Sequence, residues 1–265
     1  MFNRQQYLFI GIATFVLFVV YFGCDRVPKN HKHSKENTVA SSSEDNEIQQ
    51  LIEMGKTKLN TEQADLVASL EQQAKITASD TAKSSVLKKL SGAWYRANQK
   101  TIAGFFANQV ALIDKTENAW NIAGSTLLES IGENEGDGLR KFCTDNASKA
   151  FENAIALNPS KVEYQIAAAL CFTENPPADN PMKGILMLRD LDTKFPENAQ
   201  VLFQLAKLAM RTNQYDKAVQ RLEQILKKSP NNPDAVCLIG EAYSRKGEDA
   251  KAAMFAKKCE NLLKR

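Results

Sequence analysis

The chain has 265 residues, 43% of them hydrophobic and 25% charged, so one or two folded domains are expected. The net charge is +3, and the basic residues are spread along the sequence, which argues against a nucleic-acid-binding protein. The two histidines, His31 and His33, leave few groups for general acid–base catalysis, so we expect no enzymatic activity.

The segment 8–22, LFIGIATFVLFVVYF, is uncharged and mostly apolar. With its two neighbours it reaches the short end of the length that crosses a bilayer as a helix. We therefore expect residues 1–24 to be a membrane anchor or signal segment. Three interpretations stay open: an uncleaved anchor, which we favour, a lipoprotein signal, and a cleaved secretory signal.

The lipoprotein interpretation makes Cys24 the lipidated residue. Gly23 and Cys24 fit the last two positions of a lipobox, whereas Tyr21 and Phe22 fit poorly. A cleaved secretory signal is disfavoured because no small-x-small cleavage site follows the apolar stretch.

Orientation is judged from the charges that flank this segment. Arg26, Lys29, Lys32 and Lys35 follow it, whereas only Arg4 precedes it. The positive-inside bias favours a single-pass protein of the bacterial inner (cytoplasmic) membrane with its C-terminal part in the cytoplasm. The opposite orientation stays open.

Residues 25–44 are polar and lack periodic apolar positions, so we expect a flexible linker. We interpret His31-x-His33 as part of this solvated linker and expect no metal or cofactor. Residues 45–115 then show apolar positions at helical spacing and predict several N-terminal helices, including one degenerate helical repeat. Residues 116–265 are expected to form four further helix pairs.

Near the C-terminus the same pattern occurs twice, 34 residues apart. The first copy reads Leu202-x2-Leu205-Ala206-x2-Ala209, then Ala218-x3-Leu222 and Pro230, and the second reads Val236-x2-Ile239-Gly240-x2-Tyr243, then Ala252-x3-Ala256. This pattern resembles the tetratricopeptide repeat (TPR). The resemblance implies an all-α, right-handed solenoid of helix pairs, here preceded by the membrane helix and the linker.

Two earlier repeats fit after insertions. The first has Trp120-x2-Ala123-Gly124-x2-Leu127, then Ala147-x3-Phe151, Ala154 and Pro159, and the second has Gln165-x2-Ala168-Ala169-x2-Phe172, then Gly184-x3-Leu188, Leu191 and Pro196. The Trp120-to-Ala147 spacing of 27 residues exceeds the 16 between Leu202 and Ala218 by 11, and we place this insertion at the GENEGDG turn. Three residues inserted in the next repeat fall at its Asn–Pro stretch.

The resemblance implies a concave groove lined by the first helix of each pair. Carried over by position, the groove residues are Asn118, Asn121, Ser125, Glu163, Ile166, Leu170, Gln200, Phe203, Lys207, Met210, Asp234, Cys237, Glu241 and Ser244. Their mixture of amide, apolar and charged groups suits a peptide or helix of a partner protein. We therefore expect a membrane-tethered adaptor or scaffold, in envelope assembly, secretion or quality control. The alternative is a self-associating structural protein of the cell envelope.

The four cysteines after Cys24 are Cys143, Cys171, Cys237 and Cys259, each at a helical position that suits a small apolar residue. We expect buried free thiols rather than disulfides. Unpaired thiols agree with a cytoplasmic location, although many bacterial TPR proteins with one N-terminal anchor resemble periplasmic assembly factors. The acidic run 133–138 resembles the start of a calcium loop, but Thr144 stands where that loop needs a bidentate Glu.

Overall fold

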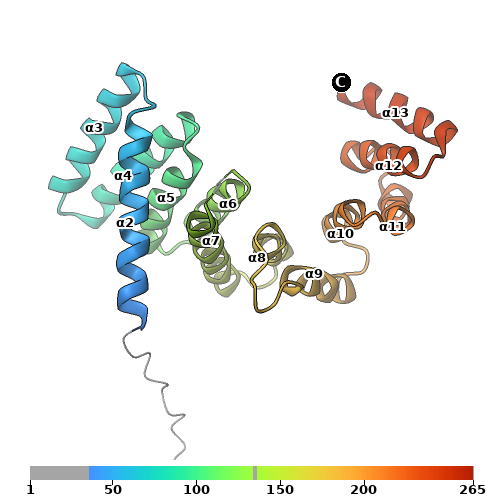
Figure 1. Cartoon of the computed structure of the whole chain (residues 1–265), viewed down its shortest axis with the longest axis horizontal. Coiled ribbons are helices and arrows are strands. Elements are labelled where there is room, and N and C mark those ends of the chain that lie inside the picture. Colours follow the sequence, from blue (N-terminus) through green and yellow to red (C-terminus); the bar gives the residue numbers. More distant parts are fainter. Residues whose placement is uncertain (1–35, 134–135, 265) are drawn as a thin grey trace, which may run out of the picture. The chain divides into compact units, whose positions relative to one another are not determined.

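The computed structural model describes residues 36–133 and 136–264, which contain twelve α-helices and no strand (Figure 1). The helices are α2 (Glu36–Lys56), α3 (Thr61–Ile76), α4 (Asp80–Arg96), α5 (Lys100–Asp114), α6 (Glu117–Ile131), α7 (Asp137–Leu157), α8 (Val162–Glu174), α9 (Lys183–Lys194), α10 (Ala199–Arg211), α11 (Tyr215–Lys228), α12 (Pro233–Arg245) and α13 (Asp249–Leu263). Contacts divide the chain into two compact units between Ser43 and Glu44.

The predicted anchor, residues 1–24, lies outside the described residues. None of the helices in the described part is long and apolar enough to cross a membrane. Helix α2 begins at Glu36, inside the segment 25–44 that the sequence predicted to be a linker.

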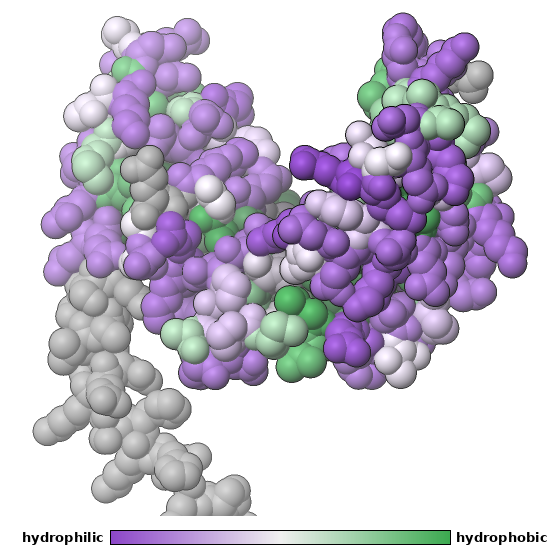
Figure 2. Space-filling view, turned by 45° about the vertical axis from the view of Figure 1, so that its right-hand side comes forward, coloured by the Kyte–Doolittle hydropathy of each residue, from purple (hydrophilic) through white to green (hydrophobic). Residues whose placement is uncertain are grey.

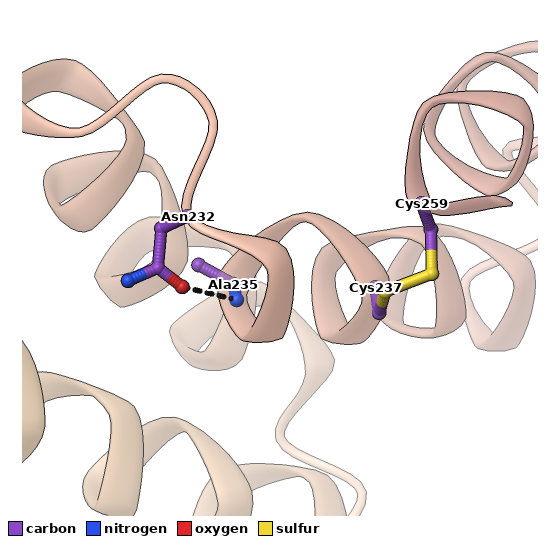
Figure 3. Close-up of a disulfide and its surroundings, with 4 residues drawn as sticks. All are labelled: Asn232, Ala235, Cys237 and Cys259. Carbon is purple, nitrogen blue, oxygen red and sulfur yellow. Dashed lines mark hydrogen bonds between the residues drawn. A yellow bond between two sulfur atoms is a disulfide. The ribbon is translucent and has the colours of Figure 1, made fainter. Parts of the chain in front are cut away.

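Several helices begin where the sequence supplies a capping side chain. Asn60 accepts a hydrogen bond from the Gln63 backbone N–H, and the Gln63 side chain accepts one from the Asn60 N–H, which forms a capping box at α3. Asn232 caps α12 by accepting from the Ala235 N–H at 2.9 Å (Figure 3). Pro233 follows at the first helical position, where its missing N–H costs nothing.

The second unit is built from helix pairs, and from α3 to α13 each helix packs against the next. The first helices of consecutive pairs, α6, α8, α10 and α12, also contact one another. Helix α10 shows how neighbouring pairs share a core: Val201 and Leu205 pack with Leu188 of α9, whereas Leu202 and Ala206 pack with residues of α11 and α12. Each pair therefore buries its apolar surface only with its neighbours, as expected for a solenoid.

Small residues set how closely paired helices approach. A Cβ added at Gly124 would lie 2.9 Å from the Phe151 ring of α7, and one at Gly184 would lie 2.6 Å from the Ala169 carbonyl oxygen of α8. Ala218 and Leu222 are fully buried, which agrees with the predicted packing roles. Ala252 is only half-buried, because no helix follows α13 in the described part of the chain.

The insertion in the first strong repeat does not lie mainly in the turn, as the sequence suggested. Helix α7 runs for 21 residues, against 14 in the equivalent helix α11, so most of the extra residues lengthen α7. Phe142 and Cys143 are buried in this extension, which explains why it is helical. The second insertion does lie where it was predicted, between the ends of α8 and α9.

The cysteine prediction is half right. Cys143 and Cys171 are buried free thiols, but Cys237 and Cys259 form a disulfide that joins α12 to α13, with 4.9 Å between their Cα atoms (Figure 3). The prediction failed because each cysteine was judged alone. The two residues lie on either side of one helix-to-helix turn, so pairing of α12 with α13 places them opposite each other.

Candidate protein-docking recesses

The first helices of three consecutive pairs enclose one recess of about 340 Å³, here called the α8–α12 recess. Its lining residues are Glu163, Ile166, Ala167, Leu170, Ala199, Gln200, Phe203, Gln204, Ile225, Asn232 and Asp234. Six of them were predicted as groove residues: Glu163, Ile166, Leu170, Gln200, Phe203 and Asp234. The fold thus brings together positions that are far apart in the sequence.

The α8–α12 recess has an apolar floor and an acidic rim. Ile166 is buried, and Leu170 and Phe203 are half-buried beside it. Glu163 and Asp234 are exposed at the rim, and neither forms an ion pair within the described residues. An apolar side chain inserted among these residues, next to a Lys or Arg, would satisfy both features.

The predicted groove residues of α6 lie elsewhere. Asn118 lines a different recess, between α4 and α6. Ser125 donates a long hydrogen bond of 3.5 Å to Asn121 within the helix. These three residues are therefore not part of the α8–α12 recess.

The remaining predicted residues of α10 and α12 also lie outside its lining. Met210 packs partly against the core, and Lys207 is exposed. Cys237 forms the disulfide with Cys259 of α13. On α12, Glu241 pairs with Arg245 at 3.7 Å and Ser244 is exposed.

Sequence reasoning missed a larger recess of about 620 Å³, here called the α4–α6 recess. It is lined by Lys88, Ser91, Gly92, Tyr95, Arg96, Ala107, Val110, Asp114, Thr116, Asn118, Ala119, Ile122 and Thr126. Helices α4 and α5 match the repeat pattern poorly, so no groove positions could be transferred to them. The exposed apolar side chains of α4 and α6 were the available signal.

Electrostatic contacts fix the walls of the α4–α6 recess. Asp114 receives hydrogen bonds from Lys88 at 2.7 Å and from Ser84 at 2.6 Å. The hydrogen bond from Lys88, and to a smaller extent the one from Ser84, holds the pKa of the Asp114 carboxyl below its usual range. Tyr95 donates to Glu129 of α6 at 3.0 Å, which ties α4 to α6.

A further set of side-chain contacts holds α6 against α8, which are the first helices of consecutive pairs. Tyr164 of α8 donates a hydrogen bond to Glu117 at 2.5 Å, and Lys161 pairs with the same carboxylate at 3.2 Å. The bond from Tyr164, followed by that from Lys161, lowers the pKa of Glu117. The face shown in Figure 2 is largely hydrophilic.

A tetratricopeptide repeat family model matches residues 183–236, from α9 to the start of α12. A tetratricopeptide repeat protein from Parabacteroides merdae is 16% identical, with a TM-score of 0.52 over 81% of this chain and 79% of that chain. The type IV pilus biogenesis factor PilW (16% identity, TM-score 0.47, 69% of this chain, 78% of that chain) is less similar in structure. MamA from Desulfovibrio magneticus is 14% identical, with a TM-score of 0.45 over 68% of this chain and 95% of that chain. None of the curated proteins matches the sequence. The part of the chain that the structure describes is therefore an all-helical repeat protein, and residues 183–236 within it match the tetratricopeptide repeat family model.

Proposed function

We propose that this protein is a membrane-tethered scaffold that binds a peptide or helix of a partner protein in the α8–α12 recess. The observation that carries the proposal is the convergence of α8, α10 and α12 on one apolar recess with an acidic rim. Its lining residues include neither a histidine nor a cysteine, so we propose a binding role rather than catalysis.

Site-specific photo-crosslinking in cells tests this proposal. A photoreactive amino acid at Gln200, exposed on the recess rim, should give a discrete crosslinked product, and Phe203→Ala should remove it by deleting the apolar anchor. The same amino acid at Lys227, exposed on α11 outside the recess, is the control. Identical products from both positions, or none from Gln200, would contradict the proposal.

We propose that residues 1–24 hold the scaffold at the bacterial inner membrane, with the repeats on the exported side. The Cys237–Cys259 disulfide supports this side, because disulfides persist in oxidising compartments and are rare in the cytosol. We give the disulfide more weight than the positive-inside bias, because that bias rests on only the few Lys and Arg residues that flank the apolar segment. In a Cys24→Ser background, an introduced cysteine in the linker should react with a membrane-impermeant maleimide while the inner membrane is intact. Labelling only after lysis of that membrane would place the repeats in the cytoplasm.

A self-associating structural role is the second candidate. Helix α13 has no buried residue, and Met254 and Leu263 on it are 58% and 70% exposed. A second copy that stacks on this helix would bury them. Light scattering of the protein at increasing concentration separates the candidates, since a constant monomer mass would exclude stacking.

A further inference from the structure

The second helices of two neighbouring pairs enclose another recess, of about 440 Å³, here called the α9–α11 recess. Its lining residues are Met182, Ile185, Arg189, Leu205, Leu208, Ala209, Thr212, Gln214, Lys217 and Arg221. It shares no residue with the α8–α12 recess, although α10 contributes to both. The two recesses therefore use different sides of α10.

The floor of the α9–α11 recess is apolar. Leu205 and Ala209 are buried, and Leu208 and Ile185 are half-buried next to them. Met182 is 48% exposed at the edge. A recess of this volume, walled by aliphatic side chains, accepts one or two apolar side chains of a bound segment.

The rim carries three cations and no carboxylate. Arg189 comes from α9, and Lys217 and Arg221 come from α11. None of the three forms an ion pair within the part of the chain that the structure describes. The carboxylates adjacent in sequence to Arg189 and Lys217 are engaged elsewhere, since Asp190 pairs with Lys194 and Asp216 with Lys246, each at 2.7 Å. Glu223, two residues after Arg221, accepts a hydrogen bond from Tyr243.

The two cations of α11 are close to each other. Lys217 and Arg221 are four residues apart on α11, a spacing at which like charges destabilise a helix. Lys217 donates only to the neutral amide oxygen of Gln214, at 2.6 Å. An external anionic group would neutralise the rim, and an apolar group would cover the floor.

We propose that the α9–α11 recess docks an acidic amphipathic segment of a partner protein. Its apolar side chains lie on Leu205, Leu208 and Ile185, and its Asp or Glu side chains face Arg189, Lys217 and Arg221. Paired guanidinium–carboxylate contacts at such a rim are directional, and they add specificity to the apolar contact. A flat anionic membrane surface would leave the apolar floor unfilled, so a peptide segment fits the recess better.

Selection of displayed random 16-residue peptides on the full-length protein tests the proposal. Peptides that bind should be enriched in Asp and Glu beside apolar residues. Synthetic copies, measured by fluorescence anisotropy, should lose at least about tenfold in affinity on Arg189→Glu, which changes an exposed side chain and leaves the core intact. Lys227→Glu makes the same kind of charge reversal elsewhere on α11 and should change the affinity by less than about twofold.

Three outcomes would overturn the proposal. The first is a set of selected peptides without acidic residues. The second is affinity that Arg189→Glu leaves unchanged, or that depends on Phe203→Ala, which would assign the peptides to the α8–α12 recess. The third is binding to phosphatidylglycerol vesicles that Arg189→Glu abolishes while no peptide is selected, which would make the cationic rim a membrane-contact surface.

Discussion

Replacing Gly124 by alanine tests the close approach of α6 to α7 directly. The added Cβ would lie 2.9 Å from the ring of Phe151, and the Phe151 side chain is fully buried. Overpacking of this kind costs about 1–3 kcal/mol. Alanine in a helix interior recovers about 1 kcal/mol relative to glycine. The difference of these two effects is a net loss of between about 0 and 2 kcal/mol in the free energy of unfolding.

Gly92→Ala is the matched control, because Gly92 also lies inside a helix. The atom nearest to its added Cβ is the mobile Arg96 Nη1, at 3.4 Å, so only the gain in helix propensity remains. Thermal melts followed by circular dichroism should show Gly124→Ala below wild type by up to about 8 °C, and Gly92→Ala at or above wild type. Equal midpoints for the two variants would refute the assigned register of α6 against α7.

Three further predictions concern single groups. Cys259→Ser removes a crosslink between residues 22 apart, and α12–α13 should lose about 3 kcal/mol, seen as faster amide exchange in α13. Burial, followed by the hydrogen bond to Glu223, raises the pKa of Tyr243 to about 12, whereas the pKa in the unfolded chain is about 10. Tyr243 therefore stabilises the fold fully below about pH 10, and this stabilisation is lost between about pH 10 and 12. Urea midpoints at pH 9 and 11 should show a smaller drop for Tyr243→Phe than for wild type. Burial raises the pKa of the Cys171 thiol to about 12, so it should react with a thiol reagent only after unfolding.

Each of these predictions has a contrary result. Unchanged amide exchange of α13 in Cys259→Ser would mean that the disulfide adds no stability to the α12–α13 pair. The same pH dependence in Tyr243→Phe as in wild type would assign the alkaline loss to other groups. Rapid labelling of Cys171 in the native protein would contradict its burial in α8.

The repeat pattern predicted many of the buried core positions, because equivalent positions of successive helix pairs make equivalent packing contacts. Gly124, Ala206 and Gly240 occupy the same repeat position, where a small residue allows the paired helices to approach closely. The same logic selected Glu163, Ile166, Leu170, Gln200 and Phe203, which line the α8–α12 recess. It could not describe α4 and α5, where the pattern is too degenerate to transfer any position.

Features that depend on two elements were not predictable from either element alone. Arg189 and Arg221 each look like a solvated helix residue, and only the packing of α9, α10 and α11 places them on one rim. Cys237 and Cys259 likewise fit small apolar positions singly. Their spacing across one turn was the available signal, and it becomes decisive only when the two helices are known to pair.

The two recesses that share α10 carry opposite charge at their rims, acidic at Glu163 and Asp234 and basic at Arg189, Lys217 and Arg221. A segment complementary to one rim meets like charge at the other, so one peptide cannot occupy both with equal affinity. If both recesses bind, the scaffold discriminates between two segments by charge while using similar aliphatic floors. Raising the salt concentration should then weaken both interactions and reduce the discrimination, because the apolar contacts that remain are alike in the two recesses.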